Sequence, residues 1–220
     1  MQQRAADESS GCAWALDASL ERWEEQMRVL LASRSPQRSA ILTQLGIPFR
    51  VQPSEHDEQT VPGDPVATVE ENARGKALHV AARVPPEPGE VVLGVDTIVV
   101  LGDDILGKAA DEAQARDYLR RLAGRTHDVV SGLCLVADGR TACGHAVTSV
   151  TFRPLTAEAL DRYLASGEWR ERAGAYAIQG IGSSLVQGVR GDYFNVVGLP
   201  VALLADKLEQ LGVGTLSWLP

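Results

Sequence analysis

The sequence predicts one α/β domain built around a mixed β-sheet. Between residues 28 and 212, apolar runs typical of strands alternate with segments that carry helix start and stop signals. The dipeptide Asp138-Gly139 joins two strand-like runs and favours a tight antiparallel hairpin. At 220 residues, of which 45% are hydrophobic, the chain is long enough to bury a core without disulfide bonds.

The first half of the domain is predicted to contain two helices between strands. The run RVLLAS (28–33) predicts the first strand, and Ser35 and Pro36 then begin a helix that Gly46 ends. Ile47, Phe49 and Val51 alternate as in a second strand. After them come a polar loop (52–65), a helix over roughly 66–83, the loop VPPEPGE, and the apolar run 91–101 with the turn GDD. The run 91–101 is either a buried strand pair or one long strand.

The second half begins with a helix that Asp111 and Gln114 start as a capping box and that Gly124 closes. Residues 126–137 and 141–153 are the two strands of the predicted hairpin. The remaining expected elements are a helix from Thr156 to Gly167, a glycine-rich strand region over 173–198, and a helix from Pro200 to Leu211.

The ends of the chain are set apart from this domain. Residues 1–27 form an N-terminal extension in which Leu16, Leu20 and Trp23 share one helical face, and residues 213–220 form a short C-terminal tail. The extension is either an accessory helix or the product of an upstream start codon, with Met27 as the true first residue.

Composition restricts the class of partner. A net charge of −8 argues against binding to a nucleic-acid polymer, but leaves room for a small positive pocket. No run approaches the ~20 apolar residues of a membrane span, and the acidic N-terminus lacks a signal peptide, so we expect a cytoplasmic protein. Cys12, Cys134 and Cys143 form no CxxC pair and are expected to be free thiols. A homodimer is the default oligomer.

Two charged residues stand where a charge is costly. Arg38 lies in the first turn of a helix, where a cation opposes the helix dipole unless an anion binds there; a solvated arginine is the alternative. Asp96 lies within VVLGVDTIVVL, where a carboxylate needs a partner or a metal. We expect a bend at Gly94 to end the buried part of the strand at Asp96, so that the carboxylate faces a cleft. The alternative is that the Asp96 oxygens are buried and accept hydrogen bonds from nearby backbone groups.

Lysine is rare in this chain, which has only Lys76, Lys108 and Lys207 beside eighteen arginines. Lys76 and Lys108 are therefore candidates for binding phosphate, with plain surface positions as the alternative. The loop residues His56, Asp57 and Glu58 are either solvated or, together with Asp96, supply oxygen ligands to Mg²⁺. Gln179 lies in a glycine-rich segment whose backbone can approach a ligand closely.

Taken in order, nine segments of the chain resemble the Maf family of nucleoside triphosphate pyrophosphatases. The resemblance spans about 28–212 and rests on LLASRSPQR, SEHDE, ENARGKA, GVDTIVV, ILGK, LAGRTHDVVSG, VTFRPLT, RAGAYAIQGIGSSLV and GDYFNVVGLP. It implies a Maf/ITPase-like two-lobed α/β fold with a cleft over a mixed sheet. It also implies metal-dependent hydrolysis of a nucleoside triphosphate to the monophosphate and pyrophosphate, with Mg²⁺ and alternatively Mn²⁺ or Co²⁺.

The resemblance also implies roles for individual residues. Asp96 and Glu58 match the two catalytic carboxylates, which also hold the metal. The positions that match polyphosphate-binding residues are Ser33, Arg38, Lys76 and Lys108, and those linked to choice of base are Gln37, Thr97 and Gln179.

Gln179 bears on the choice of base, because an amide both donates and accepts and so pairs with uracil or thymine, or with cytosine if the amide is flipped. The chain thus resembles the dTTP/UTP subgroup, with a modified pyrimidine nucleotide as a further possible substrate. It departs from that subgroup at Gln37, where an arginine is usual, at Ala109, where a proline is usual, and at Ala177, where a glycine is usual. Alternatives are methylated-GTP or broad specificity, or a non-catalytic nucleotide-binding regulator of cell division and septum formation.

Overall fold

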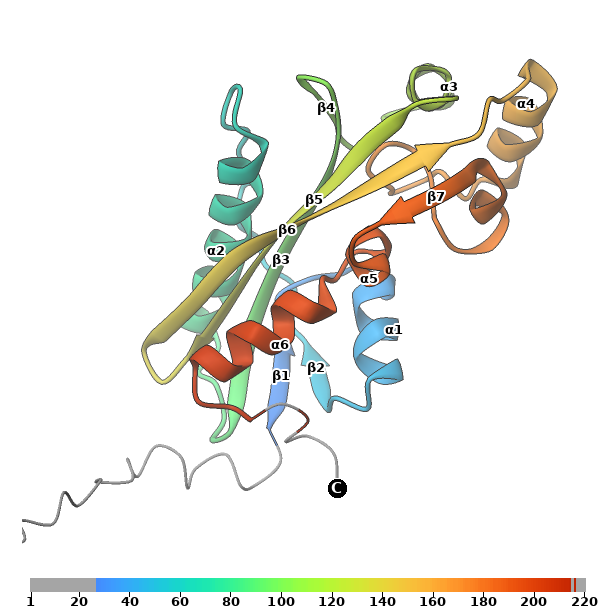
Figure 1. Ribbon diagram of the computed structural model, residues 1–220. Coiled ribbons are helices and arrows are strands. Elements are labelled where there is room, and N and C mark those ends of the chain that lie inside the picture. The colour runs from blue at the N-terminus through green and yellow to red at the C-terminus, as the bar shows by residue number, and fades with distance from the viewer. Residues whose placement is uncertain (1–26, 215, 217–220) are drawn as a thin grey trace, which may run out of the picture.

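The computed structural model describes residues 27–214 and 216, which form a mixed sheet with helices on both faces (Figure 1). The strands are β1 (Arg28–Leu31), β2 (Phe49–Val51), β3 (Glu90–Leu101), β4 (Asp104–Leu106), β5 (Thr126–Ala137), β6 (Arg140–Phe152) and β7 (Val186–Arg190). The helices are α1 (Pro36–Gln44), α2 (Pro65–Arg83), α3 (Glu112–Leu122), α4 (Ala157–Ser166), the 3₁₀ helix η2 (Gly180–Leu185), α5 (Tyr193–Val197) and α6 (Val201–Gln210).

The expected mixed sheet is confirmed, with strand order β2-β1-β3-β5-β6-β7 and β4 paired to β3. β1 runs parallel to both β2 and β3. The pairs β3–β4, β3–β5, β5–β6 and β6–β7 are antiparallel. The predicted helix caps are present at Ser35, Asp111 and Thr156, and in the latter two the side chain accepts a hydrogen bond from the third residue along.

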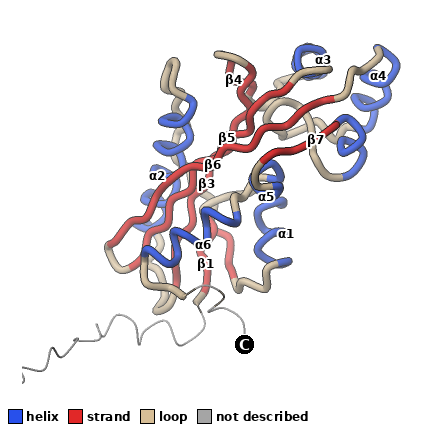
Figure 2. The backbone as a smooth tube through the Cα atoms, viewed as in Figure 1, coloured by secondary structure: helices blue, strands red, loops and turns tan. Residues whose placement is uncertain are grey.

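The molecule has two lobes because the long strands β3, β5 and β6 extend past the helices that cover one end of them. α2 covers one face of the sheet, and α1, α5 and α6 lie on the other, while α3 and α4 lie at the far end (Figures 1 and 2). One buried apolar cluster joins β1 and the near half of β3 to α1 and α6. A second joins the far ends of β3, β5 and β6 to α3 and α4. The implied two-lobed architecture is therefore confirmed.

Of the two interpretations of the apolar run before the turn GDD, one long strand is right. β3 pairs with β5 in unbroken register from Val92 to Val100, so Gly94 does not interrupt the strand. The expectation that the buried part ends at Asp96 is wrong, since Ile98, Val99 and Leu101 beyond it are also buried. Asp96 lies in the middle of a buried strand because apolar residues from both lobes cover this strand along its length.

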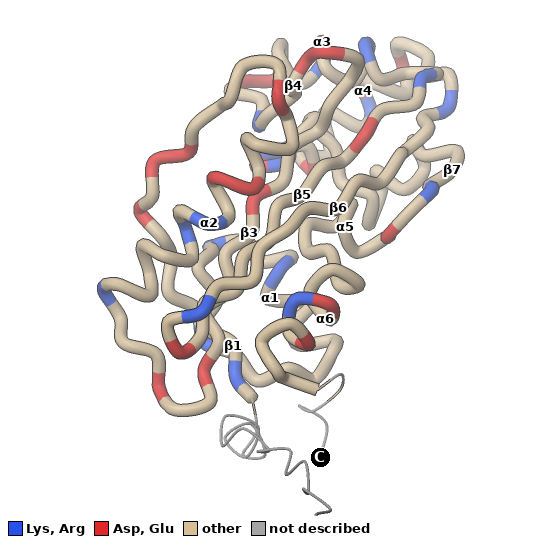
Figure 3. Tube along the Cα trace, turned by 60° about the vertical axis from the view of Figure 1, so that its left-hand side comes forward, with Lys and Arg blue, Asp and Glu red and all other residues tan. Residues whose placement is uncertain are grey.

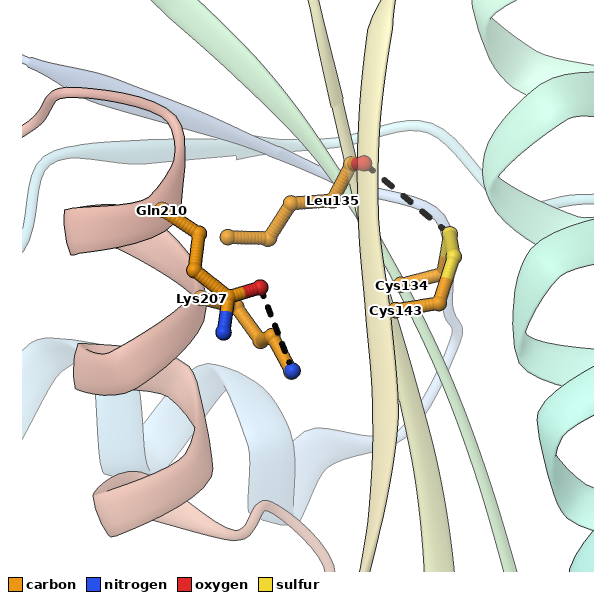
Figure 4. The surroundings of a disulfide bond; sticks show 5 residues. All are labelled: Cys134, Leu135, Cys143, Lys207 and Gln210. Carbon is orange, nitrogen blue, oxygen red and sulfur yellow. Dashed lines mark hydrogen bonds between the residues drawn. A yellow bond between two sulfur atoms is a disulfide. The ribbon is translucent and has the colours of Figure 1, made fainter.

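The expectation of free thiols is wrong for two of the three cysteines. Asp138 and Gly139 have φ of 50° and 73°, the signs that a two-residue hairpin turn requires, and the resulting register places Cys134 opposite Cys143. Their Cα atoms lie 4.0 Å apart and the two residues form a disulfide. The bond lies on the side of the hairpin away from Lys207 and Gln210 of α6 (Figure 4).

The glycine-rich region expected to be strand is mostly not strand. Of residues 173–198, only β7 is a strand, and turns, η2 and α5 make up the rest. Side chains replace the ladder hydrogen bonds here: the Tyr163 hydroxyl accepts from the N–H of Ala177, and the Glu168 carboxylate accepts from the N–H groups of Ile181 and Gly182. A local pattern does not reveal such bonds from distant residues.

The N-terminal face formed by Leu16, Leu20 and Trp23 lies outside the described residues, so the two interpretations of that extension stay predictions. Met27 is fully buried in the core beside β1. Within the described part of the chain, none of the helices is both long and apolar enough to cross a membrane.

The fold predicts unequal effects of alanine at two strand glycines. A Cβ at Gly132 of β5 would lie 2.1 Å from the carbonyl oxygen of Val69 in α2, so Gly132→Ala must push α2 away from the sheet. We expect a loss of roughly 1–3 kcal/mol in the free energy of unfolding, measured by urea denaturation.

The control is Gly188→Ala in β7, where a Cβ would meet nothing within 4 Å. This variant is expected to stay within about 0.5 kcal/mol of wild type. Equal effects of the two substitutions would contradict the close packing of α2 on β5.

Candidate active site

Asp96 faces α2 because side chains alternate along β3. Val92 on one side of it and Ile98 on the other pack in clusters that include α2 residues, and Val95 packs in the cluster on the opposite face. The side chain of Asp96 is 8% exposed, so its charge needs partners.

Two glycines bring α2 onto the sheet around this aspartate. Gly94 precedes it by two residues on the same face, and Gly132 is its partner on β5. A Cβ would lie 2.2 Å from the carbonyl oxygen of Ala73 at Gly94, and 2.1 Å from that of Val69 at Gly132. The backbone of α2 therefore contacts the sheet at the two glycines, which have no side chains. The polar residues of α2 that reach Asp96 are Asn72 and Lys76.

Lys76 of α2 connects the two candidate carboxylates. Its Nζ lies 2.6 Å from Oδ1 of Asp96 and 2.6 Å from Oε1 of Glu58, and it donates to the carbonyl oxygen of Val95 at 3.4 Å. The lysine side chain is 10% exposed and that of Glu58 is 62% exposed. The pair thus has one carboxylate in the interior and one that water reaches, joined through a single ammonium group.

The loop that carries Glu58 is fixed on α2. A Cβ at Gly75 would lie within 2.6 Å of three imidazole atoms of His56, so the ring packs directly against the helix backbone there. On the other side of Glu58, the backbone N–H of Gln59 donates to Oδ1 of Asn72 at 2.8 Å, and the Asn72 amide donates back to the carbonyl oxygen of Gln59 at 2.9 Å.

Arg38 is buried, which makes the interpretation of a solvated arginine wrong. Its guanidinium donates to the carbonyl oxygen of Gly198 at 2.9 Å, to the hydroxyl of Ser33 at 2.8 Å and to that of Thr97 at 3.3 Å. Burial lowers the pKa of Arg38, while the charges of Asp96 and Glu58 act to raise it. The first turn of α1 therefore carries a buried cation, Arg38, which has three neutral hydrogen-bond acceptors and lies near two carboxylates.

The sequence-predicted residues therefore fall into two groups. Those brought together are Ser33, Arg38, Glu58, Lys76, Asp96 and Thr97. Lys108 instead pairs with exposed Glu171 at 2.9 Å, and Gln179 is an exposed residue before η2. Gln37 accepts from the hydroxyl of Ser35 at 3.1 Å. In the view of Figure 3, basic and acidic positions are interspersed along the chain.

The sequence analysis did not identify Asn72, which bonds to Asp96 as Lys76 does. Its amide donates to Oδ2 of Asp96 at 3.0 Å, and it is 3% exposed. The signal was its spacing: Asn72 and Lys76 are i and i+4 on a helix, so they share the face that carries the lysine.

The donor set suits an oxygen-preferring divalent cation. Glu58 and Asp96 offer carboxylate oxygens on either side of one ammonium group, and Mg²⁺ is commonly bound by one or two carboxylates together with water and substrate phosphate. The described residues contain no group of three or more His, Cys, Asp and Glu side chains placed to hold a metal.

Comparison with known proteins gives this arrangement a family. The family described as Maf-like protein matches residues 28–211, which include every residue of the cluster. The chain belongs to the Maf family. Members similar to it are named dTTP/UTP pyrophosphatase: that of Alcanivorax borkumensis is 46% identical over 83% of this chain and 95% of its own length. That of Aquifex aeolicus is 42% identical over 87% and 100%, and that of Deinococcus radiodurans 42% over 86% and 96%.

The charge pairing in this Maf chain predicts how stability responds to loss of the ammonium group. Lys76→Met leaves Asp96 buried without its cation, and we expect a loss of about 3 kcal/mol in the free energy of unfolding at pH 7.5. The double variant Lys76→Met/Asp96→Asn is expected to recover most of that loss, since both buried charges are then absent. Urea denaturation measures both.

The control is Arg83→Met, which removes an ion pair with Glu55 whose side chains are 62% and 69% exposed. A change of no more than about 1 kcal/mol is expected for it. A Lys76→Met protein as stable as the control would show that the Lys76–Asp96 pair does not compensate a buried charge.

Proposed function

We propose that this chain hydrolyses a nucleoside triphosphate to the monophosphate and pyrophosphate, and that its substrate is dTTP, UTP or a modified pyrimidine nucleotide. The observation that carries the proposal is the ammonium group of Lys76 bonded to both Glu58 and Asp96. The names of the similar Maf proteins support the same reaction.

The cations of the cluster suit a polyphosphate. Arg38 and Lys76 are buried beside the two carboxylates, and the hydroxyl of Ser33 is bonded to the Arg38 guanidinium. Phosphoryl transfer spreads negative charge over the equatorial and leaving oxygens, so fixed cations lower its barrier more than covalent chemistry does. Lys108, whose ion pair with Glu171 is exposed, is proposed to bind the distal end of the chain of phosphates.

Glu58 and Asp96 are proposed to hold Mg²⁺, with Mn²⁺ or Co²⁺ as substitutes. A bound divalent cation neutralises phosphate oxygens and favours ionisation of water. Asp96 is proposed to orient a water molecule toward the α-phosphorus and to accept one of its protons as the new P–O bond forms. The bond between the α-phosphorus and the oxygen that bridges it to the β-phosphorus breaks, and that oxygen leaves with the electron pair as part of pyrophosphate.

Choice of base is proposed to depend on Gln179. Its side chain is exposed and the backbone around it contains glycines, which suits contact with a flat base. The Thr97 hydroxyl, by contrast, is bonded to Ser131 at 2.9 Å and to Arg38. We therefore propose that Gln179 contacts the base directly, and that Thr97 and Gln37 affect specificity through the start of α1.

The test is release of pyrophosphate in the presence of Mg²⁺ from a panel of common, methylated and otherwise modified nucleoside triphosphates. We expect UTP and dTTP, or a modified pyrimidine nucleotide, to be hydrolysed fastest. Asp96→Asn is expected to lower kcat about 10²–10⁴-fold, because a neutral amide neither accepts the proton nor holds the cation.

The matched control is Asp161→Asn, which neutralises a carboxylate bonded to Arg116 on the surface of α4. It should keep the kcat of wild type. Pyrophosphate release by Asp96→Asn at the wild-type rate, or nucleotide binding without release by wild type, would contradict the proposed hydrolysis. The second result would favour a non-catalytic nucleotide-binding regulator.

A further inference from the structure

One buried amide, that of Asn72, contacts Asp96 and also the backbone of the residue that follows Glu58. Asn72 of α2 donates from Nδ2 to Oδ2 of Asp96 at 3.0 Å and to the carbonyl oxygen of Gln59 at 2.9 Å. Its Oδ1 accepts from the N–H of Gln59 at 2.8 Å. Since Gln59 directly follows Glu58, the Asn72 side chain joins the backbone beside one carboxylate to the oxygen of the other.

The orientation of this amide is determined by its partners. With Nδ2 and Oδ1 exchanged, an oxygen would face both the Asp96 carboxylate and the Gln59 carbonyl group, and an N–H would face another N–H. The three bonds are therefore compatible with only one rotamer of the amide. The bond to Asp96 is buried and the two bonds to Gln59 are partly buried, and an unsatisfied polar group is costly where water is excluded.

We propose that Asn72 is a positioning residue that sets the separation and orientation of the Glu58 and Asp96 carboxylates. This inference rests on the proposed hydrolysis at those carboxylates. Asn72 occupies Oδ2 of Asp96, so that Oδ1 points to Lys76, and it holds Gln59, so that Glu58 reaches the same ammonium group.

A second contact between the loop and α2, made by His56, is expected to limit the effect of removing the Asn72 amide to the residues near Glu58. His56 packs its ring on the backbone of α2 at Gly75, two residues before Glu58. Without the Asn72 amide, the loop stays attached to α2 at His56 but loses the bonds at Gln59. The expected result is a displaced Glu58 in a folded protein.

The chain offers a matched control on the same helix and the same loop. Thr68 of α2 is 2% exposed, and its hydroxyl accepts from the N–H of Val61 at 2.9 Å and donates to the carbonyl oxygen of Asp64 at 2.9 Å. Thr68→Val therefore removes partly buried hydrogen bonds from α2 to this loop, and Thr68 bonds to neither Asp96 nor Gln59.

The experiment compares Asn72→Ala with Thr68→Val. We expect Asn72→Ala to lower kcat for pyrophosphate release about 10–100-fold, as loss of a residue that orients a ligand does, with little change in KM for the triphosphate. Thr68→Val should keep the kcat of wild type. Asn72→Asp keeps the shape and the acceptor for Gln59 but not the donor to Asp96, and is expected to be at least as impaired as Asn72→Ala.

Hydrogen exchange without nucleotide or metal provides the second readout. The Gln59 amide should exchange faster in Asn72→Ala than in wild type, and the Val61 amide faster in Thr68→Val. Wild-type kcat in both Asn72 variants, equal losses in Asn72→Ala and Thr68→Val, or an unchanged Gln59 amide would each overturn the proposal. If wild type releases no pyrophosphate, the proposed function fails, and the exchange rate at Gln59 still decides whether Asn72 holds the loop.

Discussion

The site depends on how closely the backbone of α2 approaches the sheet. Gly94 and Gly132 leave no side chain between the helix and the strands on either side of Asp96, and a Cβ at either position would overlap the helix backbone. This approach lets a lysine reach a carboxylate in the middle of a buried strand. Larger residues at the two glycines would separate the helix from the sheet and lengthen every contact that α2 makes with Asp96.

Electrostatic compensation follows from this packing. The chain carries a net charge of −8, yet two of its cations, Arg38 and Lys76, are buried close to the carboxylates of Asp96 and Glu58. Such a group of opposite charges is costly to assemble and is weak support for stability alone. In the proposed reaction its value is chemical, because positive charge and carboxylate oxygens lie at one place where a polyphosphate would bind.

Local sequence signals predicted the helices α1 to α4 and α6, the long strands, the caps of α3 and α4, and the hairpin, but not β4, η2 or α5. They also singled out Asp96 and Lys76, because a carboxylate in an apolar strand and a rare lysine are each unusual. Contacts distant in sequence were not accessible in this way: the Asn72 bonds to Gln59, the Glu168 bonds that replace strand pairing near Gln179, and the disulfide. The disulfide was nevertheless implicit in the hairpin, since Cys134 and Cys143 are equidistant from its turn.

The central claim is that Glu58 and Asp96 act as one centre through Lys76, and a double-mutant cycle tests it most directly. The measurement is kcat/KM for pyrophosphate release by wild type, Glu58→Gln, Asp96→Asn and the double variant. Groups that act as a unit are not additive, so the double variant is predicted to be about as impaired as the worse single variant. Losses that multiply in the double variant would contradict the claim, because the two carboxylates would then act independently.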